Sequence, residues 1–160
     1  VFLEAAQEVA RDYHGRVILD ESIVDACAMQ LVMAPERFDV IVTTNLFGDI
    51  LSDLIAGLVG GLGLAPGANI GDKAAIFEAV HGSAPDIAGK GVANPTALLM
   101  AVGMMLDHVG ETAKANHLRA AILATLQAGE KTRDLGGSLR TPEFAQAIIR
   151  SLQKPRRCQG

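Results

Sequence analysis

Two aspartates four residues apart are the first feature of the sequence that could do chemistry. Asp49 and Asp53 lie in the segment LFGDILSD, whose apolar residues have helical spacing, so both carboxylates fall on one helix face. Like charges at this spacing repel by about 0.2–0.5 kcal/mol, and a divalent cation such as Mg²⁺ or Mn²⁺ would turn that repulsion into coordination. The structural alternative is that acids early in a helix are favoured by the helix dipole. Asp49 and Asp53 are therefore candidate metal ligands.

A third acid, Asp25, lies inside the very apolar segment IVDACAMQLV, at residues 23–32. Apolar residues at nearly every position predict a helix that is buried on more than one side. A buried carboxylate is costly unless it is paired, so we expect a cation or a hydrogen-bond donor next to Asp25. Two-sided burial also indicates that this helix contributes to a partner surface.

A short polar segment, HGSAPDIAGKG at residues 81–91, is flanked by glycines. Glycines suit a backbone that approaches a ligand closely, although the composition equally suits a plain surface loop. Asn94 precedes Pro95, which is typical of a helix N-cap, and ligand contact is the alternative role. The glycines at 61 and 63 do not form a Rossmann fingerprint, because Pro66 stands where G-x-G-x-x-G requires glycine.

The elements that must position these residues alternate between strand and helix patterns, which predicts an α/β protein. The apolar spacing predicts helices at 2–13, 23–32, 46–59, 95–109, 111–128 and 141–152, and strands at 16–20, 39–44 and 75–80. Residues 54–71 carry no charge over 18 positions, long enough to raise the question of a membrane span. Six of those residues are Gly, so this stretch is predicted to form loops and not a span.

The overall charge argues against a nucleic-acid binder. The 160 residues carry 14 Lys and Arg against 18 Asp and Glu, and the basic cluster at 154–157 resembles a terminal tail. Cys27 and Cys158 have no CxxC spacing, which favours a reducing compartment and predicts a cytoplasmic protein. The opening VFLEAAQEVA has the pattern of mid-helix, so we expect the chain to start inside a larger protein.

Four segments together resemble the isocitrate and isopropylmalate dehydrogenase family, over about residues 1–152. They are DACAMQLV (25–32), NLFGDILSDLIAGLVGGLGLAPGANIG (45–71), FEAVHGSAPDIAGKGVANPTA (77–97) and TRDLGG (132–137). Members are metal-dependent dehydrogenases that decarboxylate 2-hydroxy acids, built from two α/β domains with a cleft between them. The resemblance implies that this chain is a C-terminal half that contributes to both domains: 1–60 to the smaller, dimer-forming domain and 61–160 to the larger, cofactor-binding one.

The resemblance also implies roles for particular residues. Asp49 and Asp53 match the family's metal-binding aspartates and Asp25 matches one that reaches Mg²⁺ or Mn²⁺ from the other subunit of a homodimer, so these three are the expected catalytic and metal residues. The helices at 22–34 and 46–59 are expected to pair with their copies. The expected cofactor-binding residues are His81, Gly82, Ser83, Ala84, Pro85, Asp86, Ile87, Ala88 and Asn94. The family's substrate-binding arginines and its catalytic Tyr and Lys would precede Val1, so the chain alone is predicted to be inactive.

Asp86 and Ile87 predict the cofactor. Family members that use NADP carry Lys-Tyr at this place, because a cation is needed for the 2′-phosphate. A carboxylate accepts hydrogen bonds from ribose hydroxyls and repels a phosphate, so the sequence favours NAD.

The substrate is predicted from two further stretches. MQLV at 29–32 and the segment 56–71 are similar to isocitrate members, which implies NAD-dependent oxidative decarboxylation of isocitrate to 2-oxoglutarate, a reaction of the tricarboxylic acid cycle. Isopropylmalate, homoisocitrate and tartrate are the alternative substrates. A non-catalytic regulatory subunit of the family and a Mg²⁺-dependent phosphohydrolase are the alternative functions.

Overall fold

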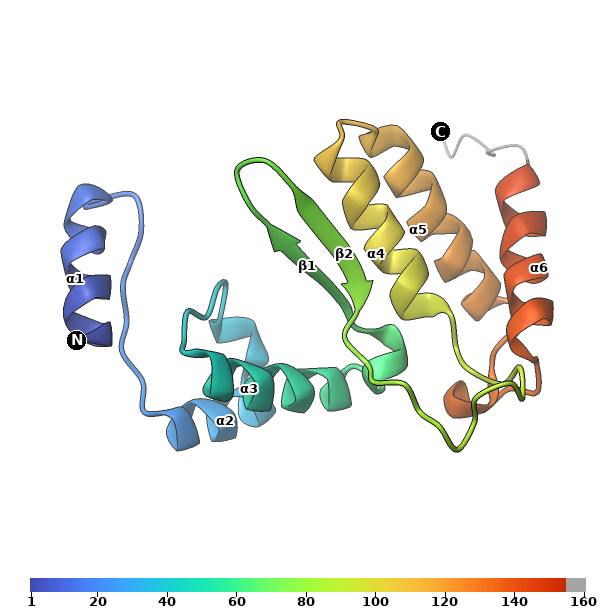
Figure 1. The fold of residues 1–160 in the computed structure, drawn as a ribbon, viewed down its shortest axis with the longest axis horizontal. Helices are drawn as coiled ribbons and strands as arrows, with labels where there is room; N and C mark the ends of the chain where they lie inside the picture. Colours follow the sequence, from blue (N-terminus) through green and yellow to red (C-terminus); the bar gives the residue numbers. More distant parts are fainter. Residues whose placement is uncertain (155–160) are drawn as a thin grey trace. The chain divides into compact units, whose positions relative to one another are not determined.

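The structure is a computed structural model that describes residues 1–154 (Figure 1). Cys158 and most of the basic tail lie outside the described residues. The chain divides into two compact units, Val1–Leu51 and a second that begins at Ser52, and each is described by itself. The division falls within helix α3 (Asn45–Leu58). The domain boundary expected at 60/61 stays a prediction.

The first unit contains α1 (Phe2–Asp12), α2 (Val24–Met33), the short 3-10 helix η1 (Pro35–Arg37) and the start of α3. The strands predicted at 16–20 and 39–44 are wrong, because both segments are irregular in the structure. A strand needs a neighbour to satisfy its backbone hydrogen bonds, and no described residue pairs with either segment. Their β-branched side chains are left in solvent: Ile18 is 96% exposed and Val40 is 82% exposed.

Helix α2 is not buried on two sides within this chain, contrary to expectation. Cys27 and Leu31 are buried, whereas Met33, at the end of the helix, is 75% exposed. Asp25 is also exposed, so the prediction of a buried carboxylate is wrong. One of its oxygens accepts a hydrogen bond from the backbone N–H of Ala26 at 2.7 Å. Water can solvate the remaining positions, so Asp25 needs no cation in this chain for its own stability.

After the end of α3, the second unit continues with the 3-10 helix η2 (Leu62–Leu64) and then a hairpin. Strands β1 (Pro66–Ile70) and β2 (Ala75–Ala79) pair antiparallel, from Pro66 opposite Ala79 to Ile70 opposite Ala75 (Figure 1). The strand predicted at 75–80 is confirmed. Its partner β1 lies in the stretch 54–71, whose glycines predict loops, so the sequence does not predict this strand. Gly67 has a packing reason, because a Cβ there would lie 2.9 Å from a methyl carbon of Val80.

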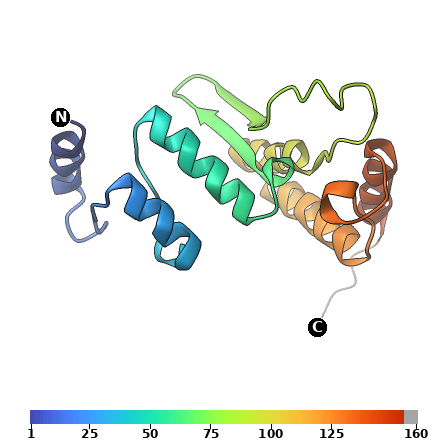
Figure 2. The same cartoon turned by 90° about the horizontal axis from the view of Figure 1, so that it is seen from below.

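Three helices complete the second unit: α4 (Thr96–His108), α5 (Thr112–Gln127) and α6 (Thr141–Gln153). The hairpin packs against α4, α4 against α5 and α5 against α6, as Figure 2 shows from below. The buried core lies between the last two helices and consists of Ala121, Ile122, Phe144 and Ile148. Helix α6 begins with Thr141 and Pro142, and the Glu143 carboxylate accepts a hydrogen bond from the Arg140 N–H at 2.8 Å.

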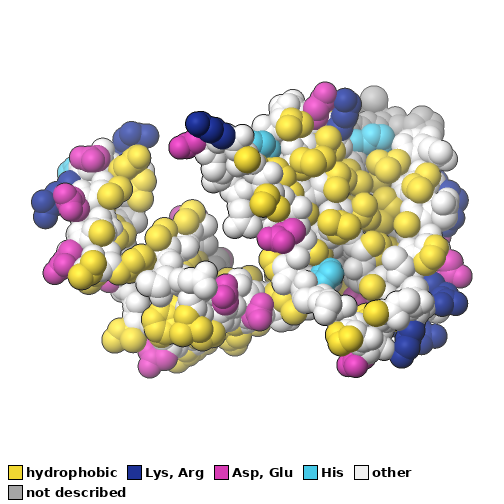
Figure 3. All heavy atoms as spheres, viewed as in Figure 1, with side chains coloured by type: hydrophobic (Ala, Val, Ile, Leu, Met, Phe, Trp, Pro, Cys, Tyr) yellow, Lys and Arg dark blue, Asp and Glu magenta, His cyan; other side chains and the backbone are white. Residues whose placement is uncertain are grey.

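Many apolar side chains lie on the surface of this chain (Figure 3). On α3, Leu51 and Ala56 are buried, whereas Leu46, Ile50 and Leu58 are 65%, 54% and 48% exposed. Exposed apolar side chains on this scale are typical of surfaces that contact other protein segments. No helix between residues 1 and 154 is both long and apolar enough to cross a membrane.

Candidate functional site

Helix α3 carries the paired aspartates as predicted. Asp49 and Asp53 occupy positions four residues apart in Asn45–Leu58, and both side chains belong to exposed residues. The Asn45 amide donates a hydrogen bond to Asp49 Oδ2 at 3.4 Å. Two exposed carboxylates one turn apart supply oxygen donors of the kind that Mg²⁺ and Mn²⁺ prefer. They fit part of a ligand set and leave the remaining positions to other groups.

The three predicted metal ligands are not assembled within one chain. Across residues 1–154, no group of three or more His, Cys, Asp or Glu side chains is close enough together to hold a metal ion. Asp25 was expected to act from the other subunit of a dimer. Its role as a ligand stays a prediction.

Residues 81–90 form an exposed loop, as the glycine-flanked composition predicts. Local hydrogen bonds shape it, from Ile87 N–H to the Ala84 carbonyl at 3.0 Å and from Ala88 N–H to the Pro85 carbonyl at 3.3 Å. Ala84 has a left-handed φ of 43° directly before Pro85. This region costs a non-glycine residue about 1–2 kcal/mol, and a following proline disfavours it further. The loop therefore stores backbone strain, which is typical of ligand-binding segments.

The end of this loop is tied to the segment that leads into α6. An Arg140 guanidinium nitrogen donates to the Lys90 carbonyl at 2.5 Å, and Thr141 N–H donates to the Gly91 carbonyl at 2.9 Å. The Thr141 hydroxyl also donates to the Ala93 carbonyl. Residues 90–93 are thus held by a segment about fifty positions away in the sequence.

Asn94 is 9% exposed and its side-chain amide makes three hydrogen bonds. Its Oδ1 accepts from the Thr96 N–H at 3.0 Å and from the Thr96 hydroxyl at 2.6 Å. Its Nδ2 donates to Asp134 Oδ2 at 2.8 Å. The predicted N-cap position is wrong by one residue: α4 begins at Thr96, Pro95 is its N-cap, and Asn94 lies just before the cap while its Oδ1 still accepts from the first helical N–H. Asp134 was not singled out from the sequence, because nothing in the spacing indicates a contact across 40 positions.

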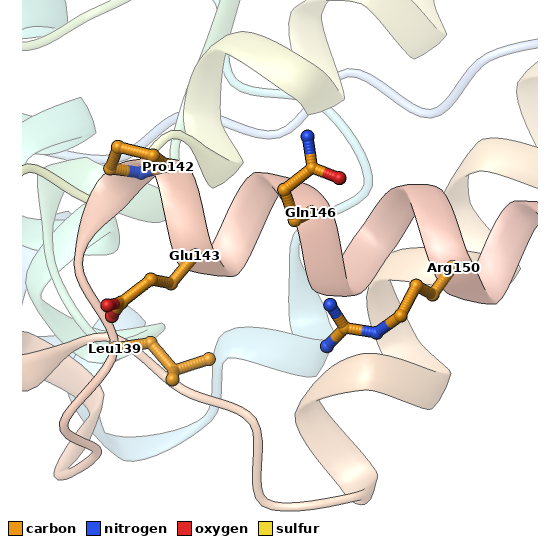
Figure 4. A pocket seen from close by; sticks show the side chains of 5 residues that line it. All are labelled: Leu139, Pro142, Glu143, Gln146 and Arg150. Atoms are coloured by element: carbon orange, nitrogen blue, oxygen red, sulfur yellow. The ribbon is translucent and has the colours of Figure 1, made fainter.

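A separate pocket of about 300 Å³ lies on α6 and is lined by Leu139, Pro142, Glu143, Gln146 and Arg150 (Figure 4). Arg150 also pairs with Glu130 at 2.6 Å. None of the predicted site residues lines this pocket. It is an open surface feature on α6, away from the residues singled out in the sequence.

Comparison with known proteins decides the family. The family model of isocitrate/isopropylmalate dehydrogenases matches residues 1–148. The chain belongs to this family. The membership confirms the α/β fold class, and the family's members are oxidoreductases that act on related 2-hydroxy acids.

Relatives within the isocitrate/isopropylmalate dehydrogenase family cover almost all of the chain. It is 59% identical over 153 residues, 96% of its length, to the isocitrate/homoisocitrate dehydrogenase of Thermus thermophilus. It is 55% identical over 148 residues, 92% of its length, to the 3-isopropylmalate dehydrogenase of Archaeoglobus fulgidus. A crystal structure of isocitrate dehydrogenase from Methylococcus capsulatus covers 96% of the chain with a TM-score of 0.91 and 54% identity.

The matches cover only part of the relatives. The chain spans 46% of the Thermus enzyme, 45% of the Archaeoglobus enzyme and 46% of the Methylococcus chain. It is therefore a fragment relative to these proteins, as expected, and corresponds to their C-terminal half. The exposed apolar segments of the first unit are consistent with a fold that is completed by other residues.

Proposed function

We propose that this chain supplies metal-binding and dinucleotide-binding residues to an enzyme that oxidatively decarboxylates isocitrate to 2-oxoglutarate with NAD. The observation that carries the proposal is the exposed pair Asp49 and Asp53 on α3, together with an exposed loop that presents Asp86, in a chain of this family. Both features have the chemistry the reaction needs.

Asp49 and Asp53 would hold Mg²⁺ or Mn²⁺, with Asp25 of a second copy completing the carboxylate set. When bound, the cation supplies Lewis-acid stabilisation of developing negative charge, and NAD accepts the hydride. The aspartates lie four residues apart on α3. Their mutual repulsion would be relieved when the cation binds.

The loop would bind the adenosine half of the dinucleotide with His81 to Ala88 and with Asn94. Asp86 is exposed and can accept hydrogen bonds from two neighbouring ribose hydroxyls. The same carboxylate repels a 2′-phosphate, which favours NAD over NADP. Because the Asn94 amide is engaged by Thr96 and Asp134, at most its second Nδ2 hydrogen and its backbone groups are open to a ligand.

Isocitrate is proposed as the substrate from residues 29–32 and 56–71, and the names of the relatives leave homoisocitrate and isopropylmalate as alternatives. The test is NADH formation by the full-length enzyme with Mn²⁺ and each of the three acids. We expect the highest kcat/KM with isocitrate. A higher value with another of these acids would reassign the substrate, whereas no NADH from any would contradict the proposed reaction.

A homodimer is proposed to cover part of the exposed apolar face of α3. Leu58→Asp is expected to lower the mass of the full-length protein in light scattering from dimer towards monomer, because Leu58 is 48% exposed and a buried charge at an interface is costly. Leu51 is unsuitable for this test, since it is 4% exposed and its replacement would disturb folding. Leu123→Asp, at a 56% exposed position on α5, is the matched control. An unchanged mass for Leu58→Asp would count against pairing through α3.

A further inference from the structure

We propose that Asp134 is a positioning residue for dinucleotide binding: its carboxylate holds the Asn94 amide and thereby fixes the C-terminal end of the loop at 81–94. This inference rests on the proposed function of that loop. Asp134 lies in the 3-10 helix η3 (Arg133–Leu135), far from the loop in sequence.

Asn94 joins the loop, the start of α4 and η3 at one part-buried point, where Asn94 is buried and Asp134 is exposed. Its Oδ1 holds the start of α4 through Thr96, and its Nδ2 holds η3 through Asp134 at 2.8 Å. Gly63, in η2, lies against the same contact, because a Cβ there would be 3.4 Å from Asn94 Cβ and 3.6 Å from Asp134 Oδ2. A Cβ at residue 63 would make ordinary van der Waals contact with both side chains, so η2 lies beside the Asn94–Asp134 pair. Asp134 accepts the hydrogen bond that orients the Nδ2 end of the amide.

Asp134 is itself held by a tight turn. Gly137 N–H donates to the Thr132 carbonyl at 2.8 Å, and Gly136 has a left-handed φ of 77°. A Cβ on Gly137 would lie 2.1 Å from the Lys131 carbonyl oxygen, so no other residue fits there without moving the backbone. Thr132, at the start of the turn, is fully buried. The carboxylate of Asp134 therefore projects from a fixed backbone.

The middle of the loop and its C-terminal end differ in their hydrogen-bond partners. Ile87 and Ala88 donate backbone hydrogen bonds to residues of the same loop, whereas Lys90, Gly91 and Ala93 are bound through their carbonyls by Arg140 and Thr141. Asn94 and Asp134 add the side-chain contact that continues this anchor into α4. A preformed end lowers the ordering cost that a ligand must meet when it binds a loop. Loss of the anchor should therefore weaken dinucleotide binding more than it affects the chemical step.

The test uses Asp134→Ala and Asp134→Asn in the full-length enzyme. The alanine variant is expected to raise the Kd and KM for NAD about tenfold, the equivalent of about 1.4 kcal/mol, while kcat at saturating NAD changes less than twofold. The asparagine variant keeps an acceptor oxygen for Asn94 and should return both constants to within twofold of the parent. Glu130→Ala, which breaks an exposed ion pair with Arg150, is the matched control and should leave NAD binding unchanged.

Amide hydrogen exchange without NAD measures the order of residues 90–96 independently of NAD affinity. We expect faster exchange in 90–96 for Asp134→Ala and parent-like exchange for Asp134→Asn. An unchanged Kd for NAD in Asp134→Ala, or an equal loss of kcat and of NAD affinity, would overturn the positioning role. NAD binding by the parent enzyme is measured before any variant is compared. If the parent enzyme does not bind NAD, that result contradicts the proposed function and not only the role of Asp134.

Discussion

Replacing Asp49 or Asp53 by asparagine is expected to lower kcat/KM for isocitrate in the full-length enzyme by at least about 100-fold at fixed Mn²⁺. Groups that only orient metal ligands cost about 10–100-fold when they are removed, and direct ligands should cost at least as much. Asparagine keeps the size of the side chain but removes the charge that attracts the cation. Raising the Mn²⁺ concentration should recover part of the loss, because weaker binding is offset by mass action.

The matched control for both variants is Asp72→Asn. Asp72 is exposed in the turn between β1 and β2. Its replacement by asparagine removes the same charge at a position away from the proposed site. We expect its kcat/KM to stay within twofold of the parent. If Asp49→Asn and Asp53→Asn bind Mn²⁺ with parent affinity by electron paramagnetic resonance, the two carboxylates are not the metal ligands.

Asp86→Lys is expected to shift the ratio of kcat/KM with NADP to that with NAD by at least about 100-fold towards NADP. Hydrogen bonds to a charged group contribute about 1.5–3 kcal/mol, so their loss alone weakens NAD binding about tenfold or more. The new ammonium then attracts the 2′-phosphate that the carboxylate repelled. The measurement is initial rates with both cofactors at saturating isocitrate and Mn²⁺.

Asp86→Asn separates the effect of the ribose hydrogen bonds from the effect of charge on the 2′-phosphate. It removes the repulsion and retains one acceptor oxygen, so it should lie between the parent and the lysine variant in the cofactor ratio. The thermal midpoint should stay near that of the parent, because Asp86 is exposed and makes no core contact. An unchanged cofactor ratio in both variants would place the adenosine ribose elsewhere.

The helices were predictable from the sequence because their signals are local. All six lie within one residue of the predicted bounds at each end, and the glycine-flanked loop at 81–91 is confirmed. Caps, apolar spacing and glycines act over a few residues, so they can be seen without knowledge of the rest of the fold.

The strands and the burial of α2 could not be predicted in the same way. The segments 16–20 and 39–44 have the composition of strands but no pairing partner among the described residues, whereas β1 has strand geometry despite Gly67 and Pro66. Strand formation depends on a neighbour, which the composition of one segment does not reveal. The contact between Asn94 and Asp134 is hidden for the same reason, since it is made only when η3 and the start of α4 are packed together.

Amide hydrogen exchange of the full-length protein, measured with and without NAD, shows whether the loop at 81–94 binds the dinucleotide. We expect that saturating NAD slows exchange within 81–94, that NADP at the same concentration protects this segment much less, and that Asp86→Lys reverses the order. Protection by NAD confined to other segments, with exchange in 81–94 unchanged, would contradict the assignment of the dinucleotide site to this loop.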